Sequence, residues 1–117
     1  MDKIIIRDLK VTGIIGIYDQ ERITPQEMLI NISMETDTRK AAQADDISLC
    51  VDYEQVALKL KAHAETARRL TVEALAEDLS QICLQTPGVQ RVKIRLEKTQ
   101  AIPFTSSVGV EIKRKKS

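Results

Sequence analysis

The chain has 117 residues, enough for one modest hydrophobic core, so we expect a single domain over residues 1–117. Its 18 basic and 17 acidic residues give a formal net charge of +1, which excludes a strong overall attraction to nucleic acid or to an anionic membrane. One Phe, two Tyr and no Trp exclude the aromatic platforms on which proteins that bind single-stranded nucleic acid stack bases.

The first predicted strand lies near the N-terminus, where β-branched residues are frequent from Ile4 to Val11. The apolar run that opens it, Ile4 to Ile6, is far too short for a signal-peptide core or a membrane span. We therefore expect a cytoplasmic protein that does not associate with membranes.

A glycine-containing loop leads to the second predicted strand. Glu21 falls in this loop, where a glutamate is ordinarily solvated. The loop lacks the Lys-Ser/Thr that completes a phosphate-binding loop, so a nucleoside triphosphate site is not predicted. In the strand that follows, apolar residues alternate with others, the pattern of one buried face; they are Met28, Ile30, Ile32 and Met34.

Two amphipathic helices are predicted next, over about Tyr53–Ala67 and about Thr71–Leu84. The second ends before a Pro-Gly pair at positions 87–88, which is typical of a helix C-terminus. The apolar positions that define the first repeat every four residues; they are Val56, Leu60 and Ala64.

Two further strands close the chain, one around Val92, Ile94 and Leu96 and one from Val108 to Ile112. The order strand, strand, helix, helix, strand, strand predicts an α+β fold, ββααββ, in which two helices cover one face of a four-stranded antiparallel sheet.

The opposite face of this sheet is predicted to be polar. An open sheet of four strands has exposed edges, and pairing these edges between identical subunits would close a barrel. We expect that barrel to be lined by mixed charges, contributed by Asn31, Ser33, Glu35, Arg91, Lys93, Arg95 and Glu111.

Lys98 is the residue that most clearly breaks the strand pattern. The parity of Ile94 and Leu96 places its side chain on the apolar face at the end of the strand. Two interpretations are open: the lysine extends to water where the strand ends, or it is a desolvated group with lowered proton affinity that serves acid/base chemistry.

Glu73 and Tyr53 each open one of the predicted helices. A carboxylate in a first turn is stabilised by the helix dipole, so Glu73 is either a surface residue or a group that grips the edge of an amidine-like ring through paired hydrogen bonds. Tyr53 is either an aromatic at the edge of the core or a proton donor.

The histidine and cysteine content limits other chemistries. His63 is the only histidine, which leaves neither a Ser-His-Asp triad nor a two-histidine metal site within one chain, and we expect it to be exposed or half-buried in its helix. Cys50 and Cys83 lack the spacing of a zinc site, so we interpret both as reduced and structural. No metal or cofactor is predicted.

Six short motifs in register over almost the whole chain resemble the dihydroneopterin aldolase family. The chain departs from many relatives at Thr99-Gln100, where they carry Pro-Gly. The motifs are Gly16-Ile-Tyr-Asp-Gln-Glu21, Arg39-Lys-Ala-Ala42 with Asp45-Asp46, Val51-Asp-Tyr53, Val72-Glu-Ala-Leu-Ala-Glu77, Glu97-Lys98 and Ser107-Val-Gly-Val-Glu111.

The resemblance implies a tunnelling fold, in which four subunits join their sheets into a ring and two rings often stack as an octamer. It also implies active sites between subunits. Glu73, with the backbone at Val72, would hold the amino-pyrimidine edge of a pterin, while Tyr53 and the backbone near Val51 would come from the adjacent subunit. Glu21 would lie near the trihydroxypropyl side chain, and Lys98 would contact a substrate hydroxyl or a water.

The implied reaction is retro-aldol cleavage of 7,8-dihydroneopterin in folate biosynthesis. Because the dihydropterin ring itself can take up the electrons of the broken bond, neither a Schiff-base lysine nor a metal ion is required. The catalytic residues so implied are Lys98, Tyr53 and Glu21.

Two other functions remain as alternatives. One is a 2'-epimerase of the same fold that acts on dihydroneopterin or its triphosphate. The other is an oligomeric binding module without catalysis, which would not need Glu21, Glu73 and Lys98 to converge.

Overall fold

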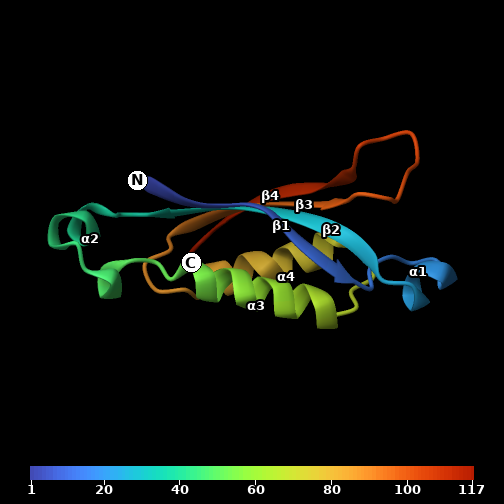
Figure 1. Ribbon diagram of the computed structural model, residues 1–117, viewed down its shortest axis with the longest axis horizontal. Coiled ribbons are helices and arrows are strands. Elements are labelled where there is room, and N and C mark those ends of the chain that lie inside the picture. The colour runs from blue at the N-terminus through green and yellow to red at the C-terminus, as the bar shows by residue number, and fades with distance from the viewer.

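An antiparallel sheet of four strands forms one layer of the molecule (Figure 1). The computed structural model describes residues 1–117. The spatial order follows the chain, so β1 and β4 are the edges, and the strands are β1 (Asp2–Gly13), β2 (Gln26–Thr36), β3 (Arg91–Lys98) and β4 (Val108–Lys115).

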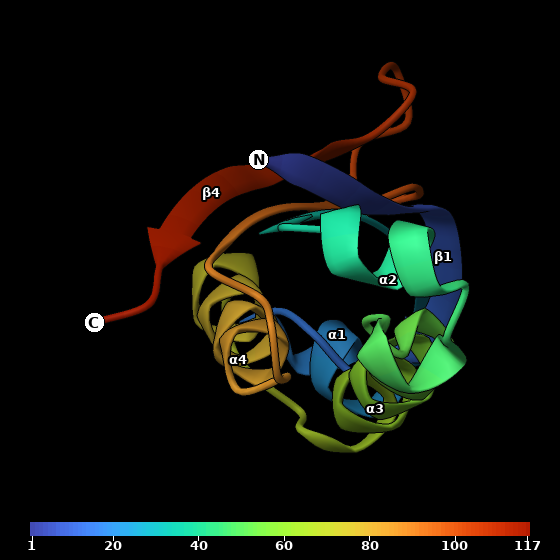
Figure 2. The same cartoon turned by 90° about the vertical axis from the view of Figure 1, so that its left-hand side faces the viewer.

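Two helices, α3 (Tyr53–Thr66) and α4 (Val72–Leu84), form the second layer on one face of the sheet (Figure 2). Each begins at a side chain that accepts a backbone N–H: Asp52 accepts from Gln55 for α3, and Thr71 accepts from Ala74 for α4. The α+β arrangement predicted from periodicity is confirmed. None of the helices has the length and apolar character needed to cross a lipid bilayer.

The hydrophobic core lies between the two layers. Alternate residues of β2 and β3 point into it, and they are 0–2% exposed. Each such aliphatic side chain contributes about 1.5–3 kcal/mol relative to an exposed one, so the alternating pattern fixes which face of the sheet the helices cover. The core positions on these strands are Met28, Ile30, Ile32, Met34, Val92, Ile94 and Leu96.

A β-bulge interrupts the pairing of β1 with β2 between Ile6 and Leu9. Asp8 has a positive φ of 53°, its N–H donates to Asn31 Oδ1 at 2.9 Å, and Asn31 Nδ2 donates to Asp8 Oδ1 at 3.1 Å. The extra residue shifts the parity of the strand, so that Ile4 and Ile6 before the bulge and Leu9 and Val11 after it all face the helices. The predicted strand is confirmed, but the bulge was not predicted.

Three short helical segments were also not predicted: α1 (Asp19–Ile23), α2 (Arg39–Ala44) and the 3₁₀ turn η1 (Ile47–Leu49). The expectation that Glu21 lies in a loop is therefore wrong, because this residue belongs to α1. Segments of three to six residues complete at most two helical turns, too few for an apolar repeat to identify them in a sequence.

The two cysteines differ. Both are free, but Cys83 is buried in the core, where burial raises the pKa of its thiol to about 12, whereas Cys50 is exposed. The structural interpretation suits Cys83, which belongs to the core, and it stays a prediction for Cys50. His63 is half-buried, as expected.

The molecule is elongated, with extents of 52 × 25 × 25 Å. In Figure 1, α1 and the β3–β4 loop lie at one end, and α2 and the N-terminus lie toward the other. These two ends of the sheet carry different chemistry.

Candidate functional site

A cavity of about 930 Å³ lies at the end of the sheet where β3 ends and β4 begins. Its walls come from the segment around α1, the first turn of α4, the last residue of β3 and the β3–β4 loop. Of the predicted site residues, four line this cavity: Glu21, Val72, Glu73 and Lys98. The sequence therefore predicted a cluster that spans 78 positions of the chain and that the fold does bring together.

Lys98 forms an ion pair with Glu21 inside this cavity. Lys98 Nζ lies 2.9 Å from Glu21 Oε2, and the two side chains are only 14% and 23% exposed. Lys98 pairs in register with the buried Met28, which confirms that strand parity turns it toward the apolar face. Its nitrogen reaches a carboxylate instead of bulk water, an outcome that neither sequence interpretation included.

The Glu21 carboxylate is fixed by several donors. Besides Lys98, it accepts from Gln26 Nε2 at 3.1 Å and from the backbone N–H of Tyr18 at 3.4 Å. The hydrogen bond from Lys98 is the main reason that the pKa of the Glu21 carboxyl lies below its ordinary value, although partial burial acts in the opposite direction. Glu21 is thus held in its anionic form beside the ammonium group.

Gly16 is needed for this arrangement. It adopts a φ of +123°, and a Cβ at this position would overlap the Glu21 carboxylate. A side chain at residue 16 would therefore both strain the backbone and displace Glu21 from Lys98.

Arg22, the residue after Glu21, joins the two sides of the cavity. Its guanidinium donates to three backbone carbonyls: Gly16 O at 3.1 Å, Arg69 O at 3.1 Å and Arg68 O at 2.7 Å. In return, Arg68 Nη2 donates to the carbonyl of Arg22 at 3.0 Å. The α1 segment that carries Glu21 is thereby fastened to the linker that leads into α4 and Glu73.

Asp78 holds the same linker from the helix side. Its two carboxylate oxygens accept from Nη2 and Nε of Arg69, both at 2.8 Å, and Oδ2 also lies 2.8 Å from His63 Nε2. The Arg69 hydrogen bonds are the largest cause of a pKa of the Asp78 carboxyl below its ordinary value. Asp78 is therefore anionic and ties α3, α4 and their linker together.

Glu73 is the carboxylate of the cavity that no protein group engages. It lies in the first turn of α4, where Thr71 caps the N–H of Ala74 and the N–H groups of Val72 and Glu73 have no partner within the helix. Glu73 itself makes no hydrogen bond or ion pair. A free carboxylate beside free N–H groups can bind a ligand edge that carries both donors and acceptors.

Val51 and Tyr53 do not line the cavity. Tyr53 is the first residue of α3 and is 60% exposed, so it is not the core-edge aromatic that the sequence allowed. The 14 residues of α3 separate it by roughly 20 Å from the helix end that adjoins the cavity. Within one chain, Val51 and Tyr53 therefore lie at the opposite end of the helix layer from Glu73.

Sequence reasoning missed Arg22, Asp78 and Gln26. Each acts through a contact between segments that are apart in the chain, and none stands at a position that breaks a periodic pattern. The only sequence signal was the placement of Arg22 directly after a candidate site residue. No group of three or more His, Cys, Asp or Glu side chains is arranged to hold a metal ion.

Comparison with known proteins gives consistent relatives. The family model for dihydroneopterin aldolase matches residues 4–113. The dihydroneopterin aldolase of Escherichia coli K12 is 37% identical over 114 residues, which cover 97% of this chain and 93% of that protein. The crystal structure of the Escherichia coli enzyme in complex with neopterin superposes with a TM-score of 0.93 at 37% identity, covering 97% of this chain and 99% of that one.

A dihydroneopterin triphosphate 2'-epimerase is a more distant relative. The protein of that name from Pseudomonas aeruginosa PAO1 is 24% identical over 112 residues, covering 96% of this chain and 91% of its own length.

Proposed function

This chain belongs to the dihydroneopterin aldolase family, and on that premise we propose that it cleaves 7,8-dihydroneopterin into 6-hydroxymethyl-7,8-dihydropterin and glycolaldehyde, a step of folate biosynthesis. The observation that carries the proposal is the joint presence of an unengaged Glu73 and a Lys98–Glu21 pair in one cavity. Glu73 can hold a pterin ring, and the Lys98–Glu21 pair can move a proton on the side chain of that pterin.

Glu73 recognises the ring in this proposal. The 2-amino group and adjacent ring N–H of a pterin present two donors in a row, which match the two oxygens of a carboxylate. The free N–H groups in the first turn of α4, at Val72 and Glu73, complement the ring's acceptors. The neopterin complex of the Escherichia coli relative supports a ligand of this class.

The Lys98–Glu21 pair handles the proton. In the cleavage, the 2'-hydroxyl loses its proton, the C1'–C2' bond breaks, its electron pair enters the conjugated imine of the ring, and C1' then takes up a proton. One proton leaves oxygen and one joins carbon, so a single acid/base unit suffices. Both transfers pass through the pair, directly or by way of a water, and it ends each turnover with its original proton count.

No metal ion and no Schiff base take part in this mechanism. The cavity is lined by carboxylates, amides, hydroxyls and one lysine, without His or Cys, a donor set that does not suit a catalytic zinc ion. The amine of Lys98 is engaged in the pair with Glu21, which favours proton transfer over nucleophilic attack. Activity should therefore survive a strong chelator and survive borohydride added together with substrate.

The complete site forms between subunits. Tyr53 and the backbone near Val51 lie far from the cavity of their own chain, and the edges β1 and β4 are both unpaired. Joining β4 of one subunit to β1 of the next is a head-to-tail contact that closes a ring, here of four subunits, and two rings stack as an octamer. This assembly brings Tyr53 of a neighbour to Glu73.

The assembly gives a prediction of its own. Because the site needs residues from two subunits, light scattering should find a tetramer or octamer in every fraction that has activity. A stable monomer with full turnover would contradict the shared site.

The 2'-epimerase is the second candidate function, since the same pair could break the C1'–C2' bond and the carbanion at C1' could then re-form it on the other face of the bound aldehyde, which inverts C2'. The more distant relationship to the epimerase favours cleavage. A binding module without catalysis is disfavoured, because recognition alone does not need a desolvated Lys98–Glu21 pair beside Glu73. We place the protein in the cytoplasm, where a folate-pathway enzyme works.

The test is to incubate the purified protein with 7,8-dihydroneopterin and to separate the products by chromatography. Stoichiometric 6-hydroxymethyl-7,8-dihydropterin and glycolaldehyde are expected. Conversion only to the 2'-epimer would identify the second candidate, and unchanged substrate in the presence of binding would identify a binding module.

A further inference from the structure

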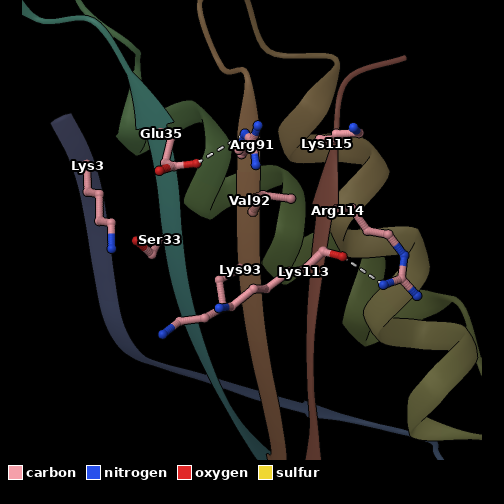
Figure 3. A pocket seen from close by; sticks show the side chains of 9 residues that line it. All are labelled: Lys3, Ser33, Glu35, Arg91, Val92, Lys93, Lys113, Arg114 and Lys115. Carbon is pink, nitrogen blue, oxygen red and sulfur yellow. Dashed lines mark hydrogen bonds and ion pairs between the residues drawn. The ribbon is translucent and has the colours of Figure 1, made fainter. Parts of the chain in front are cut away.

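The polar face of the sheet carries a concentration of positive charge at the end opposite the cavity of Lys98. Figure 3 shows the hollow at this end, which has a volume of about 470 Å³. Two rows of residues in register cross it from β1 to β4: Lys3, Glu35, Arg91 and Lys115 form the first, and Ile5, Ser33, Lys93 and Lys113 form the second.

These two rows contain five basic side chains and one carboxylate. Glu35 forms a 3.7 Å ion pair with Arg91, whereas Lys93 and Lys113 face each other across β3 and β4 without an acidic partner. Like charges directly opposite each other on a sheet are destabilising. We call the set Lys3, Arg91, Lys93, Lys113 and Lys115 the basic rows.

The next row of the same face shows that this sheet can pair its charges. Arg95 lies 3.6 Å from a carboxylate oxygen of Glu97 and 3.9 Å from one of Glu111. The face carries both signs of charge, as expected, but the acidic residues gather beside Arg95 and leave the basic rows with Glu35 alone. Within the chain, the basic rows therefore have no carboxylate partner besides Glu35.

We propose that the basic rows form a binding site for an oligophosphate anion, held mainly by Lys93 and Lys113. Successive rows on one face are about 7 Å apart along the strands, so an anion with several phosphate groups can engage both rows, whereas a single phosphate reaches one. Ser33 lies between Lys93 and Ile5 in the second row and makes no hydrogen bond within the protein, so its hydroxyl can donate to the same anion.

The site is separate from the proposed substrate site. Arg91 and Lys98 are seven positions apart along β3, a distance of roughly 23 Å, so one small ligand cannot occupy both. The hollow has no aromatic side chain on which a base could stack, which favours the phosphate chain itself over a nucleic acid. All of the residues of this site belong to one chain, so the site depends neither on the aldolase function nor on ring closure.

The test is calorimetric titration of the purified protein with inorganic tripolyphosphate at low ionic strength. The double variant Lys93→Gln/Lys113→Gln should bind about tenfold more weakly, since each exposed charge contributes a factor of up to about five. The variant Lys40→Gln/Lys59→Gln loses the same charge from exposed positions on α2 and α3 and should bind like the wild type.

A third variant should change the affinity for tripolyphosphate in the opposite direction. Glu35→Gln removes the only carboxylate of the two rows, so it should tighten tripolyphosphate binding about two- to fivefold. Turnover of dihydroneopterin by all three variants should equal that of the wild type, which separates this site from the proposed function.

Three results would overturn the proposal: equal affinity of the wild type and the Lys93→Gln/Lys113→Gln variant, equal affinity for inorganic monophosphate and tripolyphosphate, or binding of a single-stranded oligonucleotide that tripolyphosphate does not displace. Circular dichroism of each variant ensures that a loss of affinity is not a loss of fold.

Discussion

The two ends of the sheet differ in how completely their charged side chains are paired. At the cavity end, Lys98 pairs with Glu21, and Asp78 pairs with Arg69 and His63. At the other end, Lys93 and Lys113 stand opposite each other with no acidic partner. The comparison teaches that paired charges fix the position of groups, whereas unpaired charges keep their attraction for a ligand.

The cavity end contains both kinds of charge. Its pairs hold two walls at a fixed separation, and one carboxylate, Glu73, is left without a partner on the rim between them. The basic rows have no such frame, so their ligand would be held by charge more than by shape. Specific recognition is thus expected at the cavity, and salt-sensitive binding is expected at the basic rows.

The largest effect is expected from Lys98→Ala. Loss of a positioned acid/base group ordinarily costs about 100-fold or more, so turnover should fall by at least that factor. Affinity for neopterin should change much less, because Glu73 holds the ring. Rapid-quench turnover and equilibrium binding on the same variant measure the two effects separately.

Lys59→Ala, on the exposed face of α3, is the matched control and should leave both constants unchanged. If Lys98 only extended to water at the strand end, its replacement would be equally silent, and the paired charges of the cavity would have no part in catalysis.

The next largest effect is expected from Glu73→Gln. The ring edge presents only donors, and the glutamine side chain replaces one of the two acceptor oxygens of Glu73 with a donor. Affinity for neopterin should therefore fall by about 2 kcal/mol. Calorimetry measures the change. Glu54→Gln alters the corresponding first turn of α3 and should have no effect. Equal binding by Glu73→Gln and wild type would remove Glu73 from ring recognition.

Arg22→Met tests whether the hydrogen bonds that fasten α1 to the α4 linker matter for catalysis. The methionine keeps much of the side-chain length but loses all donors to the carbonyls of Gly16, Arg68 and Arg69. We expect kcat to fall about tenfold, because Glu21 is no longer held against the α4 linker.

Arg22→Lys is the informative companion variant. Lysine keeps the charge but lacks the planar guanidinium whose donors reach three carbonyls at once, so it should restore little of the lost kcat. Full rescue by lysine would mean that only the charge at position 22 matters. Unchanged kcat in both variants would show that Arg22 serves stability alone.

Periodicity predicted much of this fold, and its failures have a physical pattern. Alternation in β2 and β3 and the four-residue repeat in α3 report burial on one face, which the local sequence encodes directly. The bulge at Asp8 depends on a hydrogen bond to Asn31, 23 positions away, so no local pattern could reveal it.

The residues of the candidate site also differ in whether the sequence could reveal them. Strand parity was sufficient to turn Lys98 inward, but its partner Glu21 lies 77 positions away on a short helix with no apolar repeat. Family resemblance supplied Glu21, Val72 and Glu73. Neither route gave Arg22 or Asp78, because their roles consist of contacts made only after the helices have packed on the sheet.

The smallest effect is expected on stability, from reversing one charge in the basic rows. Lys93→Glu places a carboxylate directly opposite Lys113, which turns a repulsive cross-strand pair into an attractive one. The free energy of unfolding should rise by about 0.5–1 kcal/mol at low ionic strength. Because both side chains are exposed, the gain should fade as salt shortens the Debye length to roughly 3 Å at 1 M.

Urea unfolding at one fixed protein concentration measures this gain, since any assembly makes stability depend on concentration. Lys93→Gln is the matched control: it removes the repulsion without adding attraction, so its stability should fall between those of the wild type and Lys93→Glu. A site kept for a ligand is expected to be less stable than it could be. If Lys93→Glu instead destabilised the protein at low salt, Lys93 would already have a favourable partner, and the contrast between the paired and unpaired ends of the sheet would fail.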